Sequence, residues 1–326
     1  MALVLNETDV RSLVSMDELI DATADALAAF SAGHVVQPLR TVMEVGGPGR
    51  FLGVMPAFLP APGALGAKLV TVFPDNLARG LPGHRAVIVL LDPETGEIAA
   101  ILDGRYITEA RTAAASAVSA RHLARAGPAT LAILGSGVQA RSHLAALGRV
   151  REIAEVRVWS PTPASREAFV RDMSPGVAAP VRAVARAEDA VRGAGLVALT
   201  TASAEPVVFG AWVEPGAHVC AVGACRPNQR EMDGELVARG RVFVDSRAGA
   251  LAEAGDLVIP IAEGRLTPDH IAGELGDVVA GRATGRTSDD EITIFKSLGI
   301  AAEDVAAAAL VYRRACERGL GRGVTI

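Results

Sequence analysis

The strongest constraint on the fold of this chain is the turn Gly-Ser-Gly-Val-Gln-Ala at residues 135–140. The turn follows the apolar run 131–134 and precedes a segment with helical spacing of apolar residues. In this order of strand, turn and helix, Gly135 permits the turn, Gly137 lets a pyrophosphate approach the backbone, and Ala140 lets the helix pack close to the strand. Ordinary loops also use glycine, but the flanking strand and helix favour a dinucleotide-binding site.

The chain alternates apolar runs with helical patterns from residue 128 to residue 299. This rhythm indicates a doubly wound parallel sheet of Rossmann type, with helices on both faces. We therefore assign 128–299 as a dinucleotide-binding domain in a protein of the α/β class. Its predicted strands are 130–134, 155–159, 181–184, 196–200, 218–222 and 241–244.

The first part of the chain has a different texture. A helix is predicted over 11–30 and another from Ile107 to Ala126, which Gly127-Pro128 ends as a candidate domain boundary. A final helix over 301–318 is apolar on one face and could return to this part, so we predict a smaller α+β domain of residues 1–127 with 300–326. Short apolar runs separated by Gly, Pro and Asp-Pro turns predict a mostly antiparallel sheet. These runs are 41–45, 51–55, 67–73, 86–91 and 98–102.

Composition excludes several classes of protein. Half of the 326 residues are hydrophobic, and the net charge is −5 with no basic stripe, which argues against nucleic-acid binding. No apolar stretch is long enough for a membrane span, and residues 1–6 do not resemble a signal peptide. The cysteines, Cys220, Cys225 and Cys316, show no metal-type spacing, so we expect no metal site and a reducing, cytoplasmic location.

Three basic side chains stand out from their surroundings. Lys68 lies in an apolar strand, so it points either to solvent or into a polar cleft. Arg111 lies in a helix of small residues, where it requires a planar anion from the chain itself or from a substrate. Arg40 precedes a strand and says little alone, and the same holds for His84 and Arg85 after a Leu-Pro-Gly turn.

The end of the strand 155–159 bears on the choice of cofactor. An Asp or Glu that binds the ribose 2′-hydroxyl of NAD is expected about 20 residues after the glycines, and none is present. Ser160, Thr162, Ser165 and Arg166 could instead bind a 2′-phosphate, although such residues are also common in loops. We expect NADP, with NAD as the alternative.

Six segments, taken together and in order, resemble the ornithine cyclodeaminase/mu-crystallin family. The Arg-Thr-Ala-Ala run and the final segment are much more specific than the glycine turn. The resemblance extends from about residue 35 to the end of the chain. The segments are 66–68, 107–114, 135–140, 222–227, 243–246 and 295–304.

The resemblance implies a Rossmann domain, an N-terminal substrate and dimerisation domain, and a homodimer that acts on small amino acids or cyclic imines with NAD(P). It implies that Arg40, Lys68 and Arg111 surround the substrate, with Lys68 and Arg111 as the catalytic residues. Ser136, Val138 and Gln139 would hold the pyrophosphate. The full set of implied cofactor contacts is Arg111, Thr112, Gly135, Ser136, Gly137, Val138, Gln139, Ala140, Ser160 and Thr162, with Thr201, Ala202, Val222 and Ser297 on the nicotinamide side.

Three positions depart from the family pattern. Ornithine cyclodeaminases carry a catalytic Asp and a Lys where this chain has Cys225 and Gln229, and NADP-binding relatives often carry Arg where it has Pro161. A thiol is a poor replacement for a carboxylate base. We therefore expect a reductase of cyclic ketimines of the Δ1-pyrroline-2-carboxylate type that gives an L-imino acid. The alternatives are ornithine cyclodeamination, an alanine-type dehydrogenase, or a non-catalytic NADPH-dependent small-molecule binder.

Overall fold

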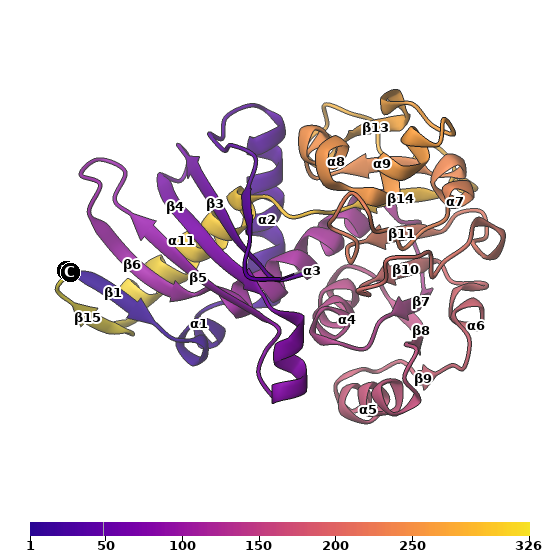
Figure 1. The fold of residues 1–326 in the computed structure, drawn as a ribbon, viewed down its shortest axis with the longest axis horizontal. Coiled ribbons are helices and arrows are strands. Elements are labelled where there is room, and N and C mark those ends of the chain that lie inside the picture. The colour runs from indigo at the N-terminus through magenta and orange to yellow at the C-terminus, as the bar shows by residue number, and fades with distance from the viewer. Residues whose placement is uncertain (48) are drawn as a thin grey trace. The chain divides into compact units, whose positions relative to one another are not determined.

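The structure, a computed structural model, describes residues 1–47 and 49–326. The chain forms two compact units (Figure 1). The first contains residues 1–111 and 299–326, and the second contains residues 112–298.

A mixed sheet forms the centre of the first unit. Its strands lie in the order β15-β1-β6-β5-β4-β3-β2, with β1 parallel to β6 and the other neighbours antiparallel. The mostly antiparallel sheet predicted from the sequence is confirmed, while the two terminal strands were not predicted because they are too short to show alternation. The strands are β1 (Ala2–Leu5), β2 (Thr41–Glu44), β3 (Phe51–Leu59), β4 (Ala64–Val72), β5 (His84–Leu91), β6 (Ile98–Asp103) and β15 (Arg322–Val324).

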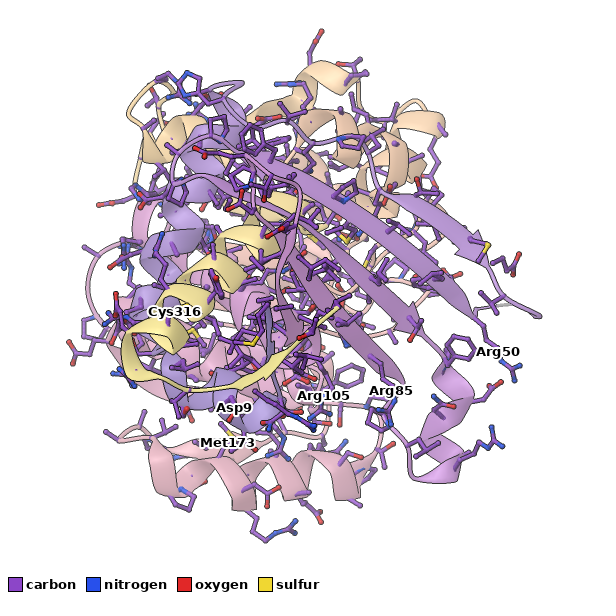
Figure 2. All side chains as sticks on the ribbon, turned by 90° about the vertical axis from the view of Figure 1, so that its left-hand side faces the viewer. Asp9, Arg50, Arg85, Arg105, Met173 and Cys316 are labelled. Carbon is purple, nitrogen blue, oxygen red and sulfur yellow. The ribbon has the colours of Figure 1, made fainter. Side chains whose placement is uncertain are left out.

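Helices α1 (Glu7–Leu13) and α2 (Met16–Ser31) replace the single helix predicted over 11–30. The chain divides there because Ser15 forms a capping box with Glu18 and starts a new helix. Near the start of α3 (Gly104–Leu123), Arg105 (Figure 2) donates from Nε and Nη2 to the Glu7 carboxylate at 3.1 and 3.0 Å, which joins α3 to α1. A short 3-10 helix, η1 (Pro74–Arg79), connects β4 to β5.

The C-terminal helix α11 (Ala301–Arg318) belongs to the first unit, as its apolar face predicted. Val305, Ala308, Val311 and Ala315 lie on this face and are buried. The helix packs against α2 and against β3, β4 and β5, and Figure 1 shows it in yellow along the sheet. Residues near position 303 are thereby brought beside strands that lie more than two hundred positions earlier in the chain.

The second unit is a parallel sheet in the order β13-β12-β14-β11-β10-β7-β8-β9. The order reverses between β7 and β10, which is the switch point at which doubly wound sheets bind ligands. The predicted Rossmann-type α/β fold is confirmed. The strands are β7 (Ala129–Leu134), β8 (Ile153–Trp159), β9 (Val181–Ala183), β10 (Leu196–Leu199), β11 (His218–Ala221), β12 (Arg241–Val244), β13 (Ile271–Glu274) and β14 (Thr293–Lys296).

Both faces of this sheet are covered. Leu131 and Ile133 belong to one hydrophobic cluster and the alternate residues Ala132 and Leu134 to another, so β7 is buried on both sides. Continuous apolar runs are therefore the expected signature of these strands. The helices of the unit are α4 (Val138–Val150), α5 (Pro163–Met173), α6 (Ala187–Val191), α7 (Gly234–Arg239), α8 (Arg247–Glu253), α9 (Gly255–Ala262) and α10 (Leu275–Val279), with short 3-10 helices η2 (Ser174–Gly176), η3 (Gly210–Trp212) and η4 (Pro268–His270).

The boundary between the units differs from the one predicted at Gly127-Pro128. The division falls within α3, between Arg111 and Thr112, and the return falls between Leu298 and Gly299. The second half of α3 joins the second unit because its small residues pack there. Ser116 and Ser119 on this half hydrogen-bond to the buried His143 and His218 rings at 2.9 and 3.0 Å, and Ala120 packs in the cluster of Leu131 and Ile133.

Within 1–47 and 49–326, no helix is both long enough and apolar enough to cross a membrane.

Candidate functional site

Gly135 forms the turn at the end of β7 in a conformation that requires glycine. Its φ is +114°, and a Cβ there would lie 2.6 Å from Thr200 Oγ1 and 2.7 Å from the Thr200 carbonyl oxygen. Thr200 follows β10, and its hydroxyl donates to the Leu134 carbonyl at 3.0 Å. The turns after the two strands at the switch point therefore pack directly against each other.

Gly137 lies at the N-terminal cap of α4 and leaves the space in front of the helix open. Among the described residues, no side chain caps this helix, and a Cβ at Gly137 would meet no atom within 4 Å. The first turn of α4 therefore offers unpaired amide groups and the positive end of the helix dipole to an anion. Behind it, Ala140 is fully buried against the sheet. These residues fit the pyrophosphate of a dinucleotide.

A second turn, after β8, is hydrogen-bonded to the glycine turn. Ser136 Oγ donates to Ser160 Oγ at 3.1 Å, and Ser160 Oγ donates to the Thr162 carbonyl at 3.3 Å. Arg166 on α5 donates from Nη1 to the Ser160 carbonyl at 2.9 Å. Residues 160–166 contain no carboxylate, so the groups available beyond the strand are hydroxyls and a guanidinium.

The residues assigned to the nicotinamide side follow neighbouring strands of the same sheet. Thr201 and Ala202 come after β10, Val222 after β11 and Ser297 after β14. Because these strands are parallel, all four residues lie at the same edge of the sheet as the glycine turn. Val222 and Ser297 are buried, while Ala202 is exposed.

Lys68 lies in the first unit, on the inward face of β4. It stands opposite the buried residues Met55 on β3 and Ile88 on β5, and only 1% of it is exposed. Its Nζ lies 2.5 Å from Asp304 Oδ2, on the first turn of α11. Of the two orientations open to this lysine, the structure shows the inward one.

Arg111 on α3 is held by two carboxylates of the chain. Its Nε donates to Asp304 Oδ1 at 2.9 Å and its Nη1 donates to Glu303 Oε2 at 2.8 Å. Asp304 therefore bridges Lys68 and Arg111, and all four side chains are buried. The backbone of Gly299 lies so close that a Cβ there would collide with the guanidinium, and its φ of +78° also favours glycine.

Burial and charge determine the proton affinities in this group. Burial lowers the pKa of Lys68 to about 8, against the opposing effect of the Asp304 charge. Burial opposes ionisation of Asp304, but Arg111 and Lys68 outweigh it and hold the pKa of its carboxyl below its usual value. The first turn of a helix also favours negative charge at Glu303 and Asp304. Lys68 is therefore mostly protonated at neutral pH, and its ammonium is a stronger acid than that of an ordinary lysine.

His84 was not assigned from the sequence, but it lies on the same face of the sheet as Lys68. His84 on β5 pairs with Val72, and Lys68 pairs with Ile88, so both side chains project to one side of adjacent strands. Burial, followed by the charges of Lys68 and Arg111, lowers the pKa of His84 to about 4. The ring is neutral at physiological pH.

The acidic partners Glu303 and Asp304 were also missed. The sequence offered one signal, an adjacent acidic pair at the start of an alanine-rich helix, but no local pattern indicates which cations it meets. Arg40 lies before β2 and is half-buried, and Thr112 is buried at the start of the second unit. The described part of the chain contains no group of three or more His, Cys, Asp or Glu residues placed to hold a metal ion.

Comparison with known proteins gives consistent matches over the whole chain. A model of the ornithine cyclodeaminase/mu-crystallin family matches residues 1–319. Ketimine reductase mu-crystallin from Rattus norvegicus is 42% identical over 303 residues, which cover 92% of this chain and 93% of that protein.

Two solved structures are similar over nearly their full length. Δ1-pyrroline-2-carboxylate reductase from Thermococcus litoralis, in complex with NADH and L-proline, has a TM-score of 0.96 and 38% identity, covering 99% of this chain and 100% of that chain. An archaeal alanine dehydrogenase dimer with bound NAD has a TM-score of 0.94 and 34% identity, covering 99% of each chain.

Substitutions at the glycine turn are expected to separate folding from cofactor binding. Gly135→Ala should lower the melting temperature, because the new Cβ would collide with Thr200. Gly137→Val should leave the melting temperature nearly unchanged but weaken dinucleotide binding by about tenfold or more, because its side chain enters the space in front of α4. Differential scanning fluorimetry and calorimetric titration with NADPH measure the two effects.

Gly148 in α4 provides the matched control, since a Cβ there also meets no atom within 4 Å. Gly148→Ala should leave cofactor binding unchanged. Unaltered NADPH affinity in Gly137→Val would contradict the placement of the pyrophosphate.

Proposed function

Because this chain belongs to the ornithine cyclodeaminase/mu-crystallin family, we propose that it reduces small cyclic ketimines of the Δ1-pyrroline-2-carboxylate type with a nicotinamide cofactor to give an L-imino acid. The observation that carries the proposal is the buried ion group of Lys68, Asp304 and Arg111. It offers a proton on Lys68, which imine reduction requires, and its two cations are balanced by the carboxylates of Asp304 and Glu303. The relatives named as ketimine and pyrroline-carboxylate reductases support the same chemistry.

The residues of this group have distinct proposed roles. The cofactor, when bound, supplies the hydride. Lys68 protonates the imine nitrogen, and its lowered pKa makes this transfer favourable near neutral pH. Arg111, together with Arg40, binds the substrate carboxylate. Asp304 orients both Lys68 and Arg111 and compensates their charge inside the unit.

Cys225 supports reduction over cyclodeamination. It follows the turn after β11, is exposed, and its thiol donates to the Gly223 carbonyl at 3.4 Å. Cyclodeamination of ornithine needs a base to manage the amine proton, and this position holds a thiol in place of the family's carboxylate. Imine reduction needs only a carboxylate-binding group, one proton and the hydride.

We also propose NADP as the preferred cofactor and a homodimer as the functional state. The turn after β8 offers Ser160, Thr162 and Arg166 without a carboxylate that would repel a 2′-phosphate. In the first unit, the edge strand β2 and its neighbours expose the apolar side chains of Val36, Leu39, Val42, Met43 and Leu69. Exposed apolar edges of this kind are usually covered by a partner, and the archaeal alanine dehydrogenase is a dimer.

The first prediction concerns the reaction itself. The purified protein should oxidise NADPH, followed at 340 nm, with Δ1-pyrroline-2-carboxylate or its six-membered homologue, and should form negligible proline from ornithine. Cys225→Ser should keep the reductase rate within about twofold, because the thiol takes no part in proton transfer in this scheme. Efficient formation of proline and ammonia from ornithine would instead identify a cyclodeaminase. Alanine oxidation as the main activity would identify a dehydrogenase. Cofactor binding without turnover would identify a binding protein.

The second prediction is a pH profile. Lys68 donates only when it is protonated, so kcat/KM for the imine should be level between pH 7 and about 8 and fall as the pH rises above about 8. His84 does not contribute in this range because its pKa is about 4. Lys68→Gln should lose the pH dependence and about 100-fold in rate, whereas the exposed Arg85→Gln on β5 should change neither. A profile that stays level to pH 9.5 would remove Lys68 from the role of proton donor.

The third prediction tests cofactor choice. Calorimetric titration should show NADPH binding more tightly than NADH, and Arg166→Gln should reduce that preference by about tenfold through loss of a charge-assisted contact. Arg171 on the same helix is exposed and pairs with its neighbour Asp172, so Arg171→Gln serves as the control. Equal affinities for the two cofactors in the unmodified protein would show that this turn does not discriminate between them.

The fourth prediction tests the dimer. Light scattering should give the mass of two chains. Met43→Glu on β2 should shift the protein towards one chain, because it places a charge in the apolar contact. Leu320→Glu, at an exposed apolar position near the C-terminus, is the control and should leave the mass unchanged. A protein that is monomeric at all accessible concentrations would refute the proposed contact.

A further inference from the structure

A second buried group of charged side chains lies in the second unit and contains none of the residues assigned above. Glu231, Asp256 and Lys296 are all fully buried. Lys296 and Lys68 are the only lysines in the chain, and every other basic residue is arginine.

Glu231 joins two turns of the backbone through one carboxylate. Its Oε1 accepts hydrogen bonds from the Thr201 amide and the Thr201 hydroxyl, both at 2.7 Å. Its Oε2 accepts from the amides of Gly223 and Ala224 at 2.7 and 3.1 Å. An ionised carboxylate only accepts hydrogen bonds, so it satisfies all four donors together. The turn after β10 and the turn after β11 are thereby fastened to each other.

Asp256 and Lys296 hold Glu231 and its surroundings in place. Asp256 Oδ1 accepts from the backbone amides of Glu231 and Met232 at 2.8 and 3.0 Å. Asp256 Oδ2 lies 3.0 Å from Lys296 Nζ, which also donates to the Ala224 carbonyl at 2.5 Å. Ala224 is therefore fixed at its amide by Glu231 and at its carbonyl by Lys296.

The backbone around these two turns is closely packed. A Cβ at Gly223 would collide with the Thr201 carbonyl and the Glu231 carboxylate. A Cβ at Gly255, the first residue of α9, would likewise collide with the carbonyls of Arg226 and Gln229 in the loop that carries Cys225. The loop between β11 and Glu231 is thus anchored at both of its ends.

We propose that Glu231 is a positioning residue for the nicotinamide half of the cofactor, held in register by Asp256 and Lys296. The inference rests on the proposed function and on the family resemblance, which assigns Thr201 and Val222 to the nicotinamide side. The four donors that the Glu231 carboxylate accepts all belong to the protein, so its proposed role is indirect. Glu231 acts by fixing the backbone of Thr201, Gly223 and Ala224, so that the turns after β10 and β11 keep one separation.

The test compares two ligands that differ only in the nicotinamide ring. Binding of NADPH and of 2′-phospho-ADP-ribose is measured by calorimetric titration for the unmodified protein, Glu231→Gln, and the control Glu214→Gln, whose side chain is exposed in the same unit. Glu231→Gln should raise the Kd for NADPH at least fivefold and leave the Kd for 2′-phospho-ADP-ribose within twofold. The amide replaces an acceptor oxygen with a donor that faces backbone N–H groups. Glu214→Gln should change neither Kd.

Asp256→Asn provides a second variant if Glu231→Gln does not fold. It keeps an acceptor for the amides of Glu231 and Met232 but loses the charge that pairs with Lys296, so the Kd for NADPH alone should again rise. Equal weakening of both ligands, or no weakening of either, would overturn the inference. NADPH binding that depends on Glu231 in a protein that turns over no imine would instead refute the proposed function and leave the positioning role intact.

Discussion

The carboxylate of Asp304 is the group on which the charged centre of the first unit depends. Lys68 comes from β4, Arg111 from α3 and Asp304 from α11, and the carboxylate contacts both cations. Two cations without this bridge would repel each other in a space closed to water, and removing one member of such a buried group leaves an uncompensated charge. The packing of α11 against the sheet therefore buries its apolar face and also places Asp304 beside the two cations.

In the second unit, Glu231 has a comparable role, but it binds different groups. Asp304 organises side-chain cations, whereas Glu231 organises backbone amides of two turns. In both cases a buried acceptor gathers donors from segments that are distant in the sequence. A glycine also lies close to each group: a Cβ at Gly299 would collide with the Arg111 guanidinium, and a Cβ at Gly223 would collide with the Glu231 carboxylate. These glycines therefore leave space for the charged side chains as well as allowing the local backbone conformation.

The amino-acid sequence predicted the parts of the fold that local pattern encodes. The strands β7, β10, β11 and β12 were located closely because burial on both faces produces mostly apolar runs, and β8 was located because Val156 and Val158 alternate with charged residues. The helix α11 was predicted with its observed bounds, because its apolar face is regular and an alanine-rich run is punctuated by Gly319. The strands β13 and β14 were not recognised, because Gly273 and Glu274 in β13 and the terminal Thr293 and Lys296 of β14 interrupt the apolar pattern. The predicted domain boundary at Gly127-Pro128 follows the end of the predicted helix, whereas the two compact units divide within α3, between Arg111 and Thr112.

The same distinction applies to the candidate site. Lys68, Arg111 and the glycine turn could be selected because each is unusual in its own segment. Glu303, Asp304 and Glu231 could not, because their importance lies in pairings between distant positions. In particular, Glu231 stands in the polar run Asn-Gln-Arg-Glu-Met-Asp, which by composition resembles an exposed loop. Only the folded chain shows that this glutamate is fully buried.

The use of lysine in this chain has a consequence for its chemistry in solution. Surface cations are arginines, and both lysines are enclosed, one in each unit. An acylating reagent that attacks primary amines would find the terminal amine of the folded chain accessible and both lysine ammonium groups shielded. The rate at which such a reagent reaches Lys68 or Lys296 would therefore report how often each unit opens around its ion group. The chain thus carries two internal probes of local unfolding without any engineered label.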